Sequence, residues 1–285
     1  MITVARPAYA KVNLTLDVLA KRPDGYHDLE SIFQSVSLHD DITLELGTGE
    51  PWKVTCNVPS VPCDRRNLVW KAAAVFCEET GYDPQGLTIH VQKRIPSEAG
   101  LGGGSADAAT VLLILNEQLP QPLPMAELLS VGAKVGSDVP FCILGGTAYA
   151  EGRGERLRHI PAKGTVHYVL VKPDLSFSTP KLFGKIDACE ILSRPDQISA
   201  EKALTEGDIP ALAKLLRNVF EIAVLEDYPE ITEIKELLLS NGALGAQMTG
   251  SGSVVFGIFP TEDSARLCAH SISHLYPNTF VCKTV

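Results

Sequence analysis

The 285-residue sequence has few of the features that mark secreted, membrane or nucleic-acid-binding proteins. Its seven cysteines are widely spaced and form no Cys-x-x-Cys motif, so we expect reduced thiols rather than a disulfide framework. The longest uncharged stretches, such as residues 243–260, are broken by polar residues and glycines, which argues against a membrane span. Near the N-terminus, Arg6 and Lys11 enclose no apolar core of the kind that a secretory signal has. We therefore expect a cytoplasmic protein.

Positive charge is also scarce, because the formal net charge is -9. A protein that binds long nucleic acid needs a basic face to neutralise the backbone phosphates, so we expect no nucleic-acid partner. A small anionic ligand needs only a few local cations and backbone donors, and it remains compatible with this composition. The length and the 45% hydrophobic content suit two domains of ordinary size or one large domain. We predict no protein partner.

Two common nucleotide-binding patterns are missing. The Walker pattern requires a lysine directly after the last glycine of its loop, and no such string occurs in the chain. The dinucleotide pattern G-x-G-x-x-G fits Gly100 and Gly102 but then meets Ser105. The sequence therefore excludes a Walker loop and gives only weak support to a Rossmann domain.

A glycine cluster, residues 100–105, lies between a strand-like run at 87–95 and a helix-like run at 106–115. Glycines permit positive φ angles and let backbone N–H groups converge on an anion. We expect Ser105 to cap the following helix and Asp107 to occupy its first turn, so that the positive end of the helix faces phosphates. This cluster predicts a phosphate-holding turn.

The apolar periodicity predicts a mixed α+β chain. Helices are predicted at 67–80, 106–115, 126–135, 208–220, 230–240 and 262–275, with a short helical turn at 137–140. Strands are predicted at 10–19, 42–46, 87–91, 167–172 and 254–259, with a segment at 29–38, a turn followed by a strand within 145–150, and a last strand near the end. A charged, glycine-rich stretch at 152–154 is the candidate domain boundary.

Three segments follow one another in order over nearly the whole chain: Ala-Lys-Val-Asn-Leu at 10–14, the glycine cluster within 96–106, and Gly-Ala-Gln-Met-Thr-Gly-Ser-Gly-Ser at 245–253. Together they resemble the GHMP small-molecule kinases. The resemblance implies an α+β fold of two domains with the active site in the cleft between them. Residues 1–153 would form a ribosomal protein S5 domain 2-like N-terminal domain with the ATP loop and the catalytic residues. Residues 154–285 would form a ferredoxin-like domain that contributes to substrate binding.

Two further strings, residues 21–27 and 136–141, resemble one branch of that family. The branch phosphorylates the 2-hydroxyl of 4-(cytidine 5'-diphospho)-2-C-methyl-D-erythritol in non-mevalonate isoprenoid biosynthesis, with ATP as the donor. The sequence departs from the usual pattern in two places. Ala8 and Tyr9 stand where a serine and a proline usually lead into Ala10, and Thr249 stands where serine is usual.

The resemblance implies that Lys11 and Asp138 are the catalytic residues and lie beside each other. Phosphoryl transfer needs a group that receives the hydroxyl proton, and we assign Asp138 to it. An aspartate with an ordinary pKa of about 3.9 is a weak base, but proton acceptance late in a loose transition state tolerates that weakness. Taken alone, Asp138 would be a helix N-cap and Lys11 the exposed end of a strand.

The remaining site residues follow from the same resemblance. The substrate-binding residues would be Asn13, Tyr26, His27, Thr179 and Phe183, with the cytosine stacked on the aromatic rings. Asn67 would approach adenine, or simply cap its helix. Mg²⁺ is expected with ATP, although no carboxylate cage for a metal is evident. The residues that would bind ATP are Asn67, Pro96, Ala99, Gly100, Leu101, Gly102, Gly103, Gly104, Ser105 and Ala106.

Two alternatives stay open. One is a kinase of the same family with a mevalonate-type or homoserine-type acceptor, which would need no aromatic wall for a base. The other is a protein of the same fold that senses a ligand without catalysis, and the presence of Lys11 and Asp138 counts against it. His270 and His274 have the spacing of a metal pair, but no third ligand is evident and a solvated helix face explains them better.

Overall fold

The computed structural model describes residues 1–285 and divides them into two compact units. The first unit comprises residues 1–10, 39–97 and 102–145, and the second comprises 11–38, 98–101 and 146–285. The long strands β1 (Ile2–Lys21) and β2 (His27–Leu46) each contribute residues to both units. The units are therefore interleaved along the sequence, whereas the boundary between 153 and 154 divides the chain once and stays a prediction.

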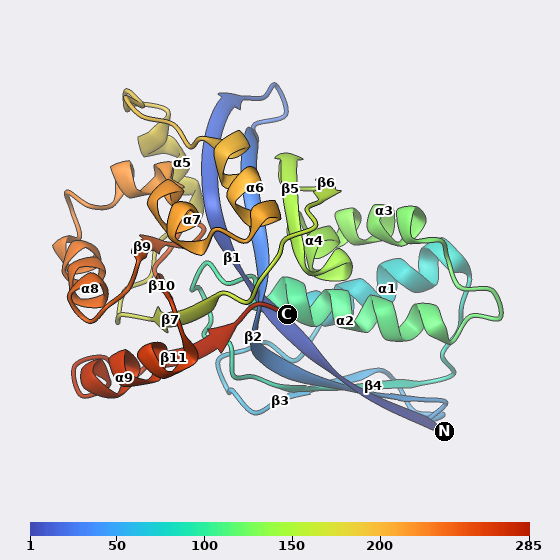
Figure 1. Cartoon of the computed structure of the whole chain (residues 1–285). Coiled ribbons are helices and arrows are strands. Elements are labelled where there is room, and N and C mark those ends of the chain that lie inside the picture. The colour runs from blue at the N-terminus through green and yellow to red at the C-terminus, as the bar shows by residue number, and fades with distance from the viewer. The chain divides into compact units, whose positions relative to one another are not determined.

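In the first unit, helices pack on a small sheet (Figure 1). Strand β4 (Leu87–Gln92) pairs antiparallel with residues 41–46 of β2 and parallel with β3 (Lys53–Cys56). The helices are α1 (Leu68–Thr80), α2 (Gly103–Glu117), α3 (Met125–Val135) and α4 (Val139–Leu144). Apolar residues of these strands and helices form one buried core. Helix α2 is buried on most sides, as its nearly continuous apolar sequence predicts.

In the second unit, β1 lies between β2 and β8 (Arg217–Asn218). Strand β5 (Thr147–Gly152) pairs antiparallel with β2 and with β6 (Arg156–His159). A separate antiparallel sheet has the order β11–β7–β10–β9, formed by Thr279–Lys283, His167–Val171, Val255–Phe259 and Gly245–Met248. The helices are α5 (Thr179–Ile186), α6 (Gln197–Glu206), α7 (Ile209–Leu215), α8 (Pro229–Ser240) and α9 (Glu262–Ile272), with a 3₁₀ helix at Val219–Ala223. Apolar residues of α8 and α9 pack against β7 and β10.

The mixed α+β class is confirmed, and so are the helices predicted at 67–80, 126–135 and 230–240. The helix predicted at 208–220 is confirmed only in its first half: α7 ends at Leu215, and Asn218 is the N-cap of a 3₁₀ helix that begins at Val219. The Asn218 side chain accepts a hydrogen bond from the Phe220 N–H and donates to the carbonyl oxygens of Met248 and Gly250. These contacts with a distant segment override the local helical pattern.

All seven cysteines are free thiols. None of the helices combines the length and the apolar composition that a membrane span requires.

Candidate functional site

Residues 98–101, which lead into the predicted phosphate-holding turn and include its first two residues, lie in the second unit and are called the first half of the turn. Gly100 has a φ of 75°, and a Cβ atom there would lie 2.2 Å from the carbonyl oxygen of Thr249, so only glycine fits. The backbone N–H of Lys11 donates to the carbonyl oxygen of Leu101 at 3.0 Å. The turn is thus held by β1 and by the segment after β9. The three motifs of the sequence meet here.

A buried polar network surrounds the start of this turn. The ammonium group of Lys11 donates to the side-chain oxygen of Asn13 at 2.8 Å, and both residues are almost fully buried. The Asn13 amide nitrogen donates to the Ser31 hydroxyl at 2.9 Å, and the Asn13 backbone N–H donates to the Thr249 hydroxyl at 3.0 Å. The Lys11 Nζ also lies 5.0 Å above the Phe33 ring. These contacts hold the Lys11 side chain in one position. The Thr249 hydroxyl takes part in the network, and a serine at position 249 would supply the same group.

The second half of the turn opens helix α2 in the first unit, and here two predictions are wrong. Gly102, with a φ of 69°, occupies the N-cap position, and no side chain caps the helix. Ser105 lies at the third helical position, so it is not the cap. Asp107 lies beyond the first turn, where it is buried and accepts a hydrogen bond from Lys93 at 2.8 Å. The first N–H groups of α2 are therefore not satisfied by a cap, which suits an anion.

Asn67 is the N-cap of α1. Its side-chain oxygen accepts the N–H of Val69 at 3.0 Å, and its side-chain nitrogen donates to the Pro62 carbonyl oxygen at 2.8 Å. The capping role that the sequence allowed is confirmed, and its approach to adenine stays a prediction.

Asp138 precedes α4, which has Pro140 in its first turn. Asp138 occupies the N-cap position of α4, as the local interpretation predicts, although its side chain makes no capping hydrogen bond. Asp138 belongs to the first unit and Lys11 to the second. That the two act as one pair stays a prediction.

An aromatic wall stands in the second unit where β2 begins. The His27 ring stacks on the Phe183 ring of α5, with ring centroids 4.5 Å apart and planes 10° apart. The His27 Nε2 lies 2.7 Å from Asp187 Oδ1, and Lys21 Nζ donates to the other oxygen of Asp187 at 3.1 Å. Hydrogen bonding from His27, and then from Lys21, lowers the pKa of the Asp187 carboxyl. The wall brings together two predicted substrate residues and keeps an ionised carboxylate beside them.

Two charged residues that contact the aromatic residues of this wall were not predicted from the sequence. Asp187 lies four positions after Phe183, one helical turn away, so helical spacing from Phe183 was the available signal. Arg153 places its guanidinium 4.9 Å from the centroid of the exposed Tyr26 ring. Nothing in the local sequence links Arg153 to Tyr26, because β5 and the turn before β2 meet only through the sheet.

An open cavity of about 560 Å³ in the second unit joins Thr179 to the glycine turns. The Thr179 and Ser251 hydroxyl groups are 2.8 Å apart. The lining is rich in hydroxyl groups and backbone, and it consists of Glu98, Gly100, Ser176, Phe177, Ser178, Thr179, Ser251 and Gly252. Such a surface offers hydrogen bonds to phosphate or hydroxyl oxygens of a ligand.

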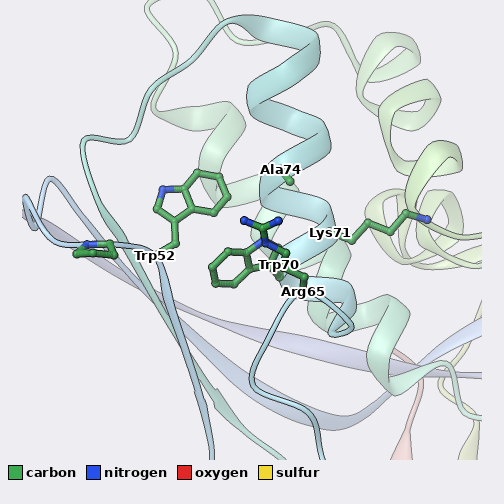
Figure 2. A pocket seen from close by; sticks show the side chains of 6 residues that line it. Trp52, Arg65, Trp70, Lys71 and Ala74 are labelled. Atoms are coloured by element: carbon green, nitrogen blue, oxygen red, sulfur yellow. The ribbon is translucent and has the colours of Figure 1, made fainter.

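A second cavity of about 650 Å³ lies beside α1 in the first unit (Figure 2). Its lining residues are Pro51, Trp52, Arg65, Trp70, Lys71 and Ala74. The Trp52 and Trp70 ring centroids are 5.6 Å apart, and no predicted site residue lines this cavity. The structure holds no group of three or more His, Cys, Asp and Glu side chains arranged for a metal ion.

Comparison with known proteins finds matches among the GHMP kinases. The profile of the GHMP kinases N terminal domain matches residues 67–146, and that of the GHMP kinases C terminal region matches residues 200–278. The chain is 41% identical over 278 residues to a 4-diphosphocytidyl-2-C-methyl-D-erythritol kinase of Clostridium tetani, covering 98% of this chain and 99% of the relative. It is 43% identical to the enzyme of that name from Acetivibrio thermocellus over the full length of both.

Solved structures are similar as well. A crystal structure of 4-(cytidine 5'-diphospho)-2C-methyl-D-erythritol kinase is 33% identical and has a TM-score of 0.82, with 99% of each chain covered. A homoserine kinase from Cytophaga hutchinsonii is 17% identical with a TM-score of 0.76, covering 99% of this chain and 94% of that one. At that identity the second likeness concerns the fold alone.

Proposed function

We propose, from the premise that this chain belongs to the GHMP kinase family, that it transfers the γ-phosphoryl group of ATP to the 2-hydroxyl of 4-(cytidine 5'-diphospho)-2-C-methyl-D-erythritol. The enzyme is an ATP-dependent phosphotransferase with an alcohol acceptor, and this reaction belongs to non-mevalonate isoprenoid biosynthesis. The observation that carries the proposal is the meeting of three distant motifs at Gly100, in a chain that resembles kinases of that name over its whole length.

The donor nucleotide is held by backbone groups. Residues 96–106 form the turn, and the uncapped N–H groups at the start of α2 face the phosphates. Asn67 holds the adenine side of the site. Residues 1–153 would supply most of this nucleotide site.

Asp138 and Lys11 act on the acceptor. Asp138 accepts the proton of the 2-hydroxyl, late in a loose transition state where positioning matters more than basicity. Lys11, oriented by Asn13, polarises the attacking hydroxyl. Because Lys11 is buried and hydrogen-bonded, its ammonium needs little reorganisation during the reaction.

The cytidine part of the acceptor is held by the aromatic wall. Tyr26, His27 and Phe183 provide ring faces for the base, and Asn13 and Thr179 provide hydrogen bonds to its sugar-alcohol part. A small acyclic acceptor would need no such wall, so the wall favours the cytidine substrate over mevalonate or homoserine. We place the enzyme in the cytoplasm and expect it to act on small molecules without a protein partner.

Mg²⁺ enters with ATP. The described side chains include no carboxylate or histidine cluster that would cage a metal, so the residues do not form a dedicated site. The ion would be held by the phosphate oxygens, with the Ser105 hydroxyl as a further ligand. When bound, it would neutralise charge on the transferred group, and the steps above depend on the residues of the chain alone.

The test is a coupled assay for ADP release with the cytidine substrate, run beside mevalonate and homoserine. We expect ADP release with the cytidine substrate only. Asp138→Asn should lower kcat by about 10²- to 10⁴-fold while ATP still binds, and the matched surface change Asp64→Asn should leave kcat unchanged. ADP release with mevalonate or homoserine instead would identify another acceptor. ATP binding without turnover on any acceptor would indicate a sensor.

A further inference from the structure

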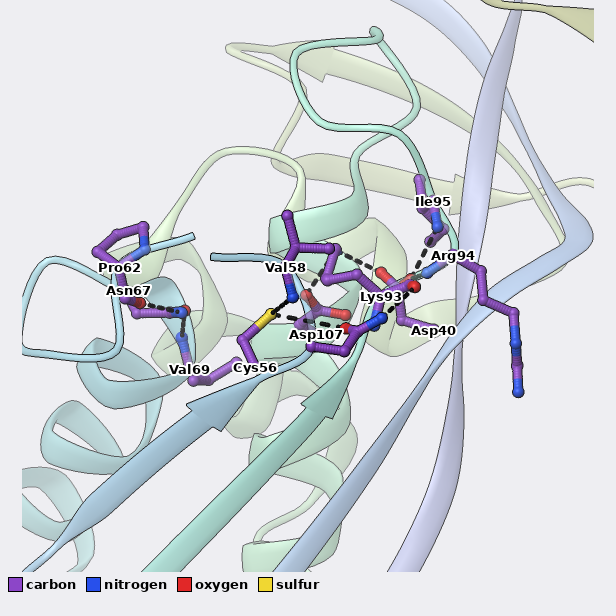
Figure 3. A network of polar contacts seen from close by, with 11 residues as sticks. Asp40, Cys56, Val58, Pro62, Asn67, Val69, Lys93, Arg94, Ile95 and Asp107 are labelled. Carbon is purple, nitrogen blue, oxygen red and sulfur yellow. Dashed lines mark hydrogen bonds and ion pairs between the residues drawn. The ribbon is translucent and has the colours of Figure 1, made fainter. Parts of the chain in front are cut away.

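A buried charged cluster lies beneath the start of α2 in the first unit. Lys93, just after β4, donates hydrogen bonds to Asp40 of β2 and, at 2.8 Å, to Asp107 of α2 (Figure 3). The side chains of Lys93, Asp40 and Asp107 are only 8%, 0% and 6% exposed. One ammonium group therefore holds two carboxylates together in the protein interior.

The cluster contacts the segment that leads into the turn and the start of α2, where the turn ends. Asp40 Oδ1 accepts the backbone N–H groups of Arg94 and, at 2.8 Å, of Ile95, immediately before Pro96. At the other end, a Cβ atom at Gly103 would lie 3.2 Å from the Lys93 ammonium nitrogen and 3.0 Å from an Ile95 methyl carbon. The first residue of α2 thus lies directly on the lysine, which accounts for glycine at this position.

The cluster is poorly suited to stability alone. The second oxygen of Asp107 is buried without a hydrogen-bond partner, and an unsatisfied buried acceptor costs stability. Burial raises the pKa of the Asp107 carboxyl to about 7, while Lys93 opposes that rise. Buried ion pairs of this kind are often replaceable by apolar residues without loss of stability. The contacts of the cluster with the segment before the turn and with the start of α2 offer another reason for its presence.

We infer that Lys93 is a positioning residue for the phosphate-holding turn, joining the segment where the turn begins to the helix on which it ends. This inference rests on the proposed function, because it concerns how that turn receives ATP. Without the ammonium group, Asp40 and Asp107 lose the hydrogen bonds that link them, so the Arg94–Ile95 segment is no longer joined to α2. The backbone N–H groups would then no longer converge on the phosphates, and small displacements of this kind reduce rates strongly.

Lys93→Met tests the inference by two measurements. Hydrogen–deuterium exchange without nucleotide should show the amides of residues 94–97 and 102–106 exchanging at least about tenfold faster, since the Lys93 contacts that order them are lost. Steady-state kinetics should show the KM for ATP raised about 10- to 100-fold, with a smaller change in kcat. Lys71→Met is the matched control. Lys71 donates to the Val135 carbonyl oxygen in the same unit and lies outside the cluster, so both quantities should stay at the wild-type value.

The double variant Lys93→Met/Asp107→Leu separates positioning from charge balance. It removes one charge of each sign and leaves Asp40 on its backbone partners. The melting temperature, which should fall in Lys93→Met because Asp107 loses its partner, should therefore return toward the wild-type value in the double variant. If Lys93 positions the turn, the KM for ATP stays raised and the exchange of residues 94–97 and 102–106 stays fast. Recovery of both along with the melting temperature, or wild-type values in the single variant, would overturn the inference. If the wild-type chain releases no ADP from any acceptor, the proposed function fails, and the exchange measurement still decides the role of Lys93 in ordering the turn.

Discussion

Replacing Asp107 by asparagine should change how the stability of the protein depends on pH. Burial of the Asp107 carboxyl is the largest cause of its raised pKa, Lys93 opposes the rise, and Asp40 adds to it. The pKa is about 7 in the folded chain and 3.8 in the reference state. The folded state therefore binds the proton more tightly than the unfolded state. A contribution of this sign is fully present below pH 3.8 and is lost as the pH rises to about 7.

The magnitude follows from the linkage relation. Between the two pKa values, the free energy of unfolding falls by about 1.4 kcal/mol per pH unit through this one group. From pH 5 to pH 7 the wild type should thus lose about 2 to 3 kcal/mol that the Asp107→Asn variant keeps. Above pH 7 the carboxylate is ionised in both states, so the difference becomes constant. The asparagine oxygen still accepts a hydrogen bond from Lys93, which keeps the packing of α2.

The assay is urea denaturation of both proteins at pH 5, 6, 7 and 8. The free energy of unfolding of Asp107→Asn minus that of the wild type should increase up to pH 7 and stay constant above it. Asp64→Asn is the control, because Arg66 lowers the pKa of the exposed Asp64 to about 2, well below the measured window. Parallel pH profiles for wild type and Asp107→Asn would refute the reasoning, since they would mean that Asp107 is ionised in the folded chain throughout.

Three further predictions concern the second unit. Gly100→Ala should lower the melting temperature and weaken ATP binding, because the added Cβ meets the Thr249 carbonyl oxygen at a positive φ; an unchanged melting curve would contradict the close approach. Phe183→Ala should raise the KM for the cytidine substrate about tenfold through lost stacking and leave the KM for ATP unchanged, whereas equal shifts in both would argue against a base-binding wall. Asp187→Asn should raise the KM for the cytidine substrate by loosening the His27 ring, and the KM for ATP serves as its internal control.

The elements that the sequence predicts best are those whose signals are local. Helix α1 buries Val69, Ala72, Ala73 and Phe76, the spacing of one helical face, and it ends at Gly81. The stretch at 208–220 has similar spacing but does not form one helix, because Asn218 bonds to backbone groups of the segment after β9. A pattern within a dozen residues carries no information about a partner thirty residues away.

The candidate site also contains residues with a local sequence signal and residues whose role depends on distant contacts. The glycine cluster and its two companion motifs are recognisable as strings, and the structure brings them together through Gly100 and Lys11. The sequence placed the cap of α2 at Ser105, because serine is a common cap and the preceding glycines suggested an irregular turn. The helix begins two residues earlier than Ser105. Lys93 and Asp40 gave no local signal at all, since their meeting depends on the pairing of β2 with β4.

Different interactions hold the two halves of the predicted phosphate-holding turn. In the second unit, residues 98–101 are held by backbone contacts, where Gly100 meets the carbonyl of Thr249 and Leu101 accepts the N–H of Lys11. In the first unit, the start of α2 is held by a buried ion cluster at Lys93. Backbone contacts between uncharged groups do not change with pH near neutrality, whereas a cluster that contains a carboxyl of raised pKa does. We therefore expect the order of the helical half of the predicted turn, and not that of residues 98–101, to vary with pH near neutrality.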